Sequence, residues 1–341
     1  FQNSINDQSN FDLAYNNLGI SFSELGIYEK AINSFTRAIN LNKKNYDAKK
    51  NLINLFLISK PKNINGHPLI KINAQINEIG NKISIKDSIE LNEIKKILEE
   101  CENTINGIDD DIHFNETQIF RKNSTNLNCN RHFKVFNEFN VIPKYCFDCY
   151  KIQINLNNVV DLIRLFFIFN NLQLENNNIR KCIAEIRHNI KGNYKGYIYC
   201  EGLEDAKKIF NKVENIIKEI KFNKIKIIIK HGCSEFYKSY PNYQKINFKG
   251  EQQMKYDVNW KEKESIIDKR NLIRANEDRE IFSPSISGIN LSDILIIKNW
   301  INYASIIGDF SFEKIYNKKF KPNFLNNVLQ SQLDFRKNDI F

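Results

Sequence analysis

The stretch that decides the fold is YKIQINLNNVVDLIRLFFIFNNL, residues 150–172. In its first part Ile152, Ile154 and Leu156 alternate with polar residues, which is the period of a half-buried β-strand. The second part, NVVDLIRLFFIFNNL at 158–172, is apolar around most of its circumference and predicts a core helix. A strand that leads directly into a buried helix indicates a layer of helices packed on a sheet.

The same two patterns continue along the chain. RKCIAEIRH (180–188) and YKGYIYCE (194–201) predict two strands joined by a turn that contains glycine. LEDAKKIFNKVENIIKEI (203–220) predicts an amphipathic helix, and KIKIIIKHG (224–232) predicts a last strand. The order β-α-β-β-α-β is typical of a ferredoxin-like α+β domain, in which two helices cover one face of a four-stranded antiparallel sheet.

Two short helices are expected near the start, in DLAYNNLGISFSELGIYEKAINSFTRAINLNKKN at residues 12–45. Apolar residues recur at i, i+4 and i+7 in each half, and Gly26 supplies the turn between them. This stretch resembles the tetratricopeptide repeat, although Lys43 stands where that family usually has proline. The large and small residues of the family pattern fall on Tyr15, Leu18, Gly19, Phe22, Gly26, Tyr28, Ala31, Phe35 and Ala38. The resemblance implies a solenoid that binds a protein or peptide partner.

The repeat is too short to stand alone. YDAKKNLINLFLI (46–58) adds one more predicted helix, whereas a solenoid usually needs about three repeats to bury its core. The first residue is Phe1 rather than Met, so we expect further repeats upstream, and an upstream signal peptide stays open.

The predicted organisation is multi-domain. From Lys60 the sequence KPKNINGHPLIKINAQINEIGNK has proline, glycine and asparagine without clear periodicity, which favours a linker. Asp87 and Glu90 then form a pair like a capping box, which predicts the start of a helix. The expected units are tetratricopeptide-type helices at 1–58, a linker at 59–86, a helix and acidic loop at 87–115, a metal-stapled ferredoxin-like domain at 116–240, and a polar segment with C-terminal helices, near 291–304 and 323–335, at 241–341.

One segment carries a candidate metal site. NLNCNRHFKVFNEFNVIPKYCFDCYK, residues 126–151, places Cys129, His132, Cys146 and Cys149 in a Cys-x2-His and Cys-x2-Cys pattern. Thiolates and imidazoles paired at this spacing bind Zn²⁺ in a tetrahedron. We therefore expect zinc to staple the loop that precedes the first strand. The alternative is a set of buried free cysteines, which behave as small apolar residues.

Three further cysteines widen this hypothesis. With the strands in the order 4-1-3-2, the topology brings Cys182, Cys200 and Cys233 to the same sheet edge as Cys149. If the hairpin pairs His188 with Tyr194, Cys182 lies directly opposite Cys200 on the neighbouring strand. An iron centre, an iron–sulfur cluster or a redox-active thiol group therefore stays open beside structural zinc.

A thiol-dependent enzyme is the first alternative function. Cys233 lies beside His231 in KHGCSEF, and an imidazole can lower the pKa of a neighbouring thiol. These two residues are the candidate catalytic pair, with the repeats recruiting the substrate.

RNA binding is the second alternative. KGYIYCEGLEDAKKIF resembles the strand-three motif of RNA-recognition sheets, where aromatic residues stack on bases. The candidate nucleic-acid contacts are Tyr197, Tyr199, Arg187 and Lys226. The sequence departs from that family, because Ile198 takes the position of a small residue and Gln153 that of an aromatic one.

Composition constrains the partners only weakly. The net charge is +10, but lysine, asparagine and isoleucine are abundant together, as AT-rich codons would make them. Seven cysteines is an odd number, and their spacing is unlike that of a disulfide-stapled domain. No apolar run approaches the roughly 20 residues of a membrane span. We therefore expect a cytoplasmic, bacterial protein whose main task is protein binding.

Overall fold

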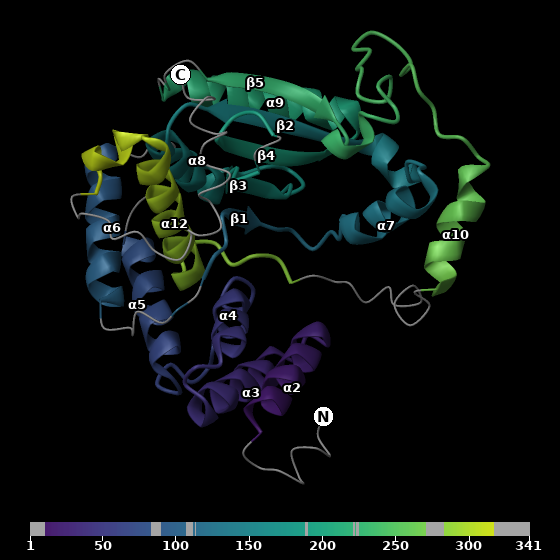
Figure 1. The fold of residues 1–341 in the computed structure, drawn as a ribbon. Helices are drawn as coiled ribbons and strands as arrows, with labels where there is room; N and C mark the ends of the chain where they lie inside the picture. The colour runs from purple at the N-terminus through teal and green to yellow at the C-terminus, as the bar shows by residue number, and fades with distance from the viewer. Residues whose placement is uncertain are drawn as a thin grey trace.

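The structure is a computed structural model that describes residues 11–82, 90–106, 112, 114–187, 190–220, 222, 225–270 and 283–316. At its centre lies an antiparallel sheet with the strand order β1-β3-β4-β2-β5 (Figure 1). The strands are β1 (Gln118–Arg121), β2 (Cys149–Leu156), β3 (Arg180–Ala184), β4 (Tyr194–Glu201) and β5 (Lys226–His231). The four predicted strands occupy the predicted order, and β1 is an additional edge strand that the sequence analysis missed.

One face of this sheet, the helix-covered face, packs on α8 (Val159–Asn171) and α9 (Gly202–Glu219). Ile152, Ile154 and Ile198 point into this layer and are completely buried. Gly196 is needed there, because a Cβ at its position would lie 2.3 Å from Cδ2 of Leu165 on α8. The Asn158 side chain caps α8 by accepting a hydrogen bond from the backbone of Asp161.

The predicted hairpin register is wrong. Cys182 pairs with Gly196, not with Cys200, and Cys200 pairs with Tyr150 on β2. The register follows from packing, since Gly196 is the residue of β4 that lets α8 approach the sheet. His188, on which the predicted register depended, lies outside the described residues.

The N-terminal helices form the hairpin that the repeat pattern predicts. They are α2 (Asp12–Glu24), α3 (Tyr28–Leu41) and the following α4 (Tyr46–Leu55). Gly19 lets α2 and α3 approach, because a Cβ there would lie 2.5 Å from the Phe35 ring. Gly26 turns the chain between them with a φ of 72°, which glycine adopts without strain.

The predicted linker contains a helix. Residues 68–82 form α5 (Pro68–Lys82), which packs beside α6 (Leu91–Ile105). Leu69, Ile70, Ile72, Ile76 and Ile79 are buried at helical spacing, although asparagine and glycine between them obscure the pattern in the sequence. The capping box of α6 is formed by Glu90 and Glu93. Asp87 and the acidic triplet at 109–111 lie outside the described residues.

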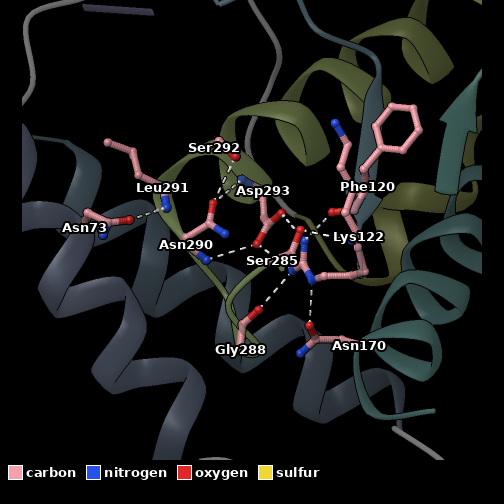
Figure 2. A network of polar contacts seen from close by, with 11 residues as sticks. Asn73, Phe120, Lys122, Asn170, Ser285, Gly288, Asn290, Leu291, Ser292 and Asp293 are labelled. Carbon is pink, nitrogen blue, oxygen red and sulfur yellow. Dashed lines mark hydrogen bonds and ion pairs between the residues drawn. The ribbon is translucent and has the colours of Figure 1, made fainter. Parts of the chain in front are cut away.

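A buried ion pair joins a further helix, α12 (Leu291–Ile307), to the sheet (Figure 2). Arg121 of β1 donates to both carboxylate oxygens of Asp293 at 3.0 and 2.8 Å, and also to Asn170 and to the carbonyl of Gly288. Asp293 lies in the first turn of α12, and this helix contacts α4, α5, α8 and β1. One hydrophobic cluster therefore extends from α3 to the sheet across the predicted domain boundaries. The helix predicted at 323–335 lies outside the described residues.

The remaining helices gather beyond one end of the sheet (Figure 1). They are α7 (Cys129–Phe139) and α10 (Trp260–Arg270), with the short helices η1 (Lys144–Asp148) and η2 (Ser234–Phe236) between them and the strands. Arg131 of α7 bonds Asp268 and Glu264 of α10 at 2.7 and 2.5 Å. A separate apolar cluster around Ile142, Phe236 and Tyr243 holds this end together. A last short helix, η3 (Phe310–Lys314), follows α12.

Candidate functional site

Four cysteines from three separate segments meet at this end of the sheet. Cys129 opens α7, Cys146 lies in η1, Cys149 begins β2 and Cys233 follows β5. Together with His132 they line one pocket, which we call the thiol pocket. Its remaining lining residues are Leu127, Phe133, Tyr145, Gly232 and Phe236.

Backbone geometry brings the cysteines of β2 and β5 together. The amide of Gly232 donates to the carbonyl of Cys149 at 2.8 Å, which extends the β2–β5 ladder by one step. Gly232 has a φ of 58°, and a Cβ there would lie 2.1 Å from the Tyr243 hydroxyl. Glycine is therefore required for the turn that carries Cys233 towards Cys149.

Without a bound cation, the thiols of Cys129, Cys146 and Cys149 stay protonated at neutral pH. Burial raises the pKa of Cys149 to about 11, and it raises those of Cys129 and Cys146 as well. Neighbouring sulfurs, that of Cys233 in each case, contribute to these shifts. Within the part of the chain that the structure describes, no three histidine, cysteine or acidic side chains stand in an arrangement that could hold a metal ion.

His132 is an uncharged member of this pocket. Burial and, to a smaller extent, the neighbouring Arg131 together lower its pKa to about 4. Its ring stacks on Tyr145 with a centroid separation of 5.6 Å. A neutral imidazole is the form that a metal ion requires.

Cys182 and Cys200 do not belong to this cluster. Both lie on the helix-covered face, where they are 2% and 4% exposed within the main hydrophobic core. Cys149 and Lys151 lie on the opposite face, because successive residues of a strand point to opposite sides. The predicted meeting of four strand-end cysteines at one edge is therefore wrong for Cys182, whereas Cys200 lies at the same edge as Cys149 and lines a further pocket with it.

The structure separates the candidate catalytic pair. Both ring nitrogens of His231 lie against backbone carbonyls, Nδ1 at 2.5 Å from Tyr243 and Nε2 at 2.9 Å from Phe147. The sulfur of Cys233 instead accepts a hydrogen bond from Nζ of Lys151 at 3.1 Å. Burial alone would lower the pKa of Lys151, but the sulfur of Cys233, together with Tyr199 and Cys149, raises it.

A much larger cavity, of about 1180 Å³, adjoins the thiol pocket and shares Cys129 and Cys233 with it. We call it the basic cavity. Its floor is the open face of the sheet, formed by the strand residues that point away from α8 and α9. These are Gln118, Phe120, Lys151, Lys181, Tyr197, Tyr199 and Lys230. Its walls are residues 125–131, 133–134 and 233–235, with Arg187, Asp268 and two neighbours of the floor, Lys122 and Ile179.

The basic cavity includes three of the four predicted nucleic-acid contacts. Tyr197, Tyr199 and Arg187 line it, whereas Lys226 is exposed at the start of β5 and does not. Lys151 and Lys181 also line the cavity and were not among the predicted contacts. The signal was present, because strand alternation places both of them on the same side as the two tyrosines.

Comparisons with known proteins identify one region of the chain. Residues 13–45 match the family model of the tetratricopeptide repeat, so the N-terminal hairpin is a repeat of this type, as its sequence predicted. No curated protein and no solved structure matches the chain. Among the described helices, none is both long enough and apolar enough to cross a membrane.

Proposed function

We propose that this protein acts by binding, and that its repeat hairpin recruits a protein or peptide partner. The observation that supports this function is the tetratricopeptide match at 13–45, which coincides with the packed α2–α3 pair. Its helix α2 also leaves apolar side chains in solvent, with Leu13 52% and Ile20 37% exposed. These two residues are seven positions apart and lie on one side of the helix, where a partner could cover them.

The test compares two chains that each lose exposed apolar side chains. Partners are enriched from cell extract on immobilised protein, purified, and their Kd is measured for the parent and for a Leu13→Ser, Ile20→Ser variant. We expect at least about tenfold weaker binding by the variant. Val258→Ser is the matched control, because Val258 is 75% exposed but lies outside the repeat. A partner that binds the α2 variant as tightly as the parent would contradict the proposal.

We also propose that the sheet with α8 and α9 is a ferredoxin-like unit to which β1 is an addition. The spatial order β3-β4-β2-β5 and the antiparallel pairing of all neighbours support this class.

A second candidate function is structural metal binding in the thiol pocket. The supporting observation is that Cys129, Cys146, Cys149, Cys233 and His132, which zinc prefers as ligands, line one pocket although they come from three segments. The side chains do not stand in ligand geometry, so binding would require new side-chain rotamers that aim the sulfurs inward. We propose Cys129, Cys146 and Cys149 as three ligands, with either His132 or Cys233 as the fourth.

Elemental analysis of untagged protein tests this candidate. About one zinc per chain is expected, lost in a Cys146→Ser, Cys149→Ser variant together with local folding. Comparing His132→Asn with Cys233→Ser assigns the fourth ligand, since only the true ligand's loss should weaken zinc binding. Bound iron with visible absorption would indicate a redox centre instead of structural zinc. Protein without any bound metal would contradict this candidate function.

A further inference from the structure

The basic cavity contains more positive charge than its surroundings compensate. Two acidic residues line it, and both are paired: Asp268 accepts from Arg131, and Glu235 lies 3.8 Å from Arg187. The lysines of the floor have weaker partners within the described residues. Lys151 bonds the sulfur of Cys233 and Lys230 bonds the hydroxyl of Ser234. Within the described ranges no carboxylate forms an ion pair with Lys181, whose Nζ lies over the rings of Phe120 and Tyr197.

Burying Lys181 and Lys230 near other cations lowers the stability of the folded chain when no ligand is bound. The pKa of Lys181 is lowered to about 8, first by burial and then by the positive charges of Lys151 and Arg187, and Glu185 and the Cys233 sulfur only partly oppose the shift. Burial also lowers the pKa of Lys230. The pKa of Lys151 moves the other way, because the Cys233 sulfur and Tyr199 outweigh its burial. Two of the three lysines are therefore destabilised as cations, and a ligand of opposite charge would stabilise them.

The aromatic residues do not offer free ring faces for bases. Nζ of Lys151 lies 5.1 Å from the ring centroid of Tyr199, and Nζ of Lys181 lies 5.1 Å from that of Tyr197. An ammonium over a ring makes a cation–π contact, so a stacking nucleobase would have to displace the lysine. The groups that the cavity presents to a ligand are therefore ammonium groups.

The spacing of these cations indicates more than one anionic group in the ligand. In the strand register Lys230 of β5 lies opposite Lys151 of β2, which lies opposite Tyr199 of β4. Tyr197, on the same face of β4, lies opposite Lys181 of β3, so the cations form a row across four strands. Three steps of about 4.8 Å between strands separate Lys230 from Lys181 by roughly 14 Å across the sheet, and the two-residue offset between Tyr199 and Tyr197 on β4 adds to this distance. A single phosphate reaches one end of such a row, whereas a chain of phosphates reaches several lysines.

We propose that the basic cavity binds a small molecule that carries two or more phosphate groups, held by Lys151, Lys181 and Lys230. Phosphate oxygens accept hydrogen bonds from ammonium groups and supply the missing negative charge. This inference does not depend on the repeat, because the cavity is built from the sheet and from the segments around it.

Isothermal titration with inorganic tripolyphosphate at fixed ionic strength tests this inference on the full chain. The parent should bind, and Lys181→Met and Lys230→Met should each weaken binding at least about tenfold. Lys226→Met is the control, because it removes the same charge from the same sheet outside the cavity. It should change Kd less than about twofold. Thermal unfolding checks that each variant folds, and the two cavity variants give independent readings.

Three results would overturn the proposal. The first is a parent protein that does not bind millimolar tripolyphosphate. The second is a Lys226→Met variant that loses as much affinity as Lys181→Met, which would indicate attraction by the overall charge. The third is a single-stranded oligouridylate that binds more than about tenfold tighter than tripolyphosphate and depends on Lys181, which would make RNA the ligand.

Discussion

The two faces of the central sheet give buried positive charge different partners. On the helix-covered face, Arg121 is held by both oxygens of Asp293, and Arg180 donates to backbone carbonyls that include Phe169 at 2.7 Å. On the open face, Lys151 and Lys181 rest against rings and a sulfur. The same strands supply both faces by simple alternation. A buried cation whose oxygen partners all come from the chain stabilises the fold, whereas a buried cation without such oxygen partners indicates a ligand.

The largest effect is expected from removing the carboxylate of the helix-covered face. Asp293 is completely buried, so Asp293→Ala leaves the guanidinium of Arg121 without its counterion. We expect the free energy of unfolding to fall by about 3–5 kcal/mol in urea titrations. Glu251→Ala removes a surface partner of Lys255 and should leave the midpoint unchanged. Equal losses in both variants would mean that the buried Arg121–Asp293 pair stabilises the fold no more than a surface ion pair.

A smaller loss is expected from adding volume to the same face. Gly196→Ala puts a methyl group against Leu165 and Phe169 of α8, which should cost about 1–3 kcal/mol. Its neighbour Tyr197 points to the open face, and Tyr197→Phe should change stability by less than about 0.5 kcal/mol. The pair is measured by chemical denaturation, and a reversed order would mean that the open face carries the packing.

The smallest effect is a gain of stability on the open face. The pKa of Lys181 is about 8 in the folded chain and its ordinary value is 10.5, so the unfolded chain binds more protons between these pH values. The free energy of unfolding therefore rises with pH across that window, and the penalty is fully present below pH 8. Lys181→Met should be more stable than the parent by about 1 kcal/mol at pH 7.

Denaturation at a series of pH values checks this sign. The advantage of Lys181→Met should shrink as the pH rises from 8 towards 10.5. An advantage that grows over this range would mean that Lys181 is charged more easily in the folded chain than in the unfolded one.

Local patterns in the sequence predicted most of the helices and strands. The long-range contacts that these elements make could not be predicted from such patterns. The repeat hairpin and the strand–helix unit at 150–172 have clear periods, and both are present. Strand β1 has four residues, too few for a period to be recognised, and it forms only by pairing with β3. The polar residues within α5 hid the buried positions of that helix.

The candidate site was predicted in its residue types more than in its arrangement. The spacing of Cys129, His132, Cys146 and Cys149 indicated that they meet, and they line one pocket. The hairpin register required knowledge of how Gly196 packs on α8, so Cys182 was placed opposite the wrong residue. The partner of Cys233 was also missed, since Lys151 is remote in sequence and comes near only through the β2–β5 pairing.

The most direct test of the central claim is one set of urea titrations on the parent and on Lys181→Met, with and without millimolar tripolyphosphate. If the lysines of the open face serve a ligand, the variant is the more stable chain without tripolyphosphate, and tripolyphosphate stabilises the parent more than the variant. A variant that is less stable than the parent without tripolyphosphate would contradict the account, because Lys181 would then support the fold.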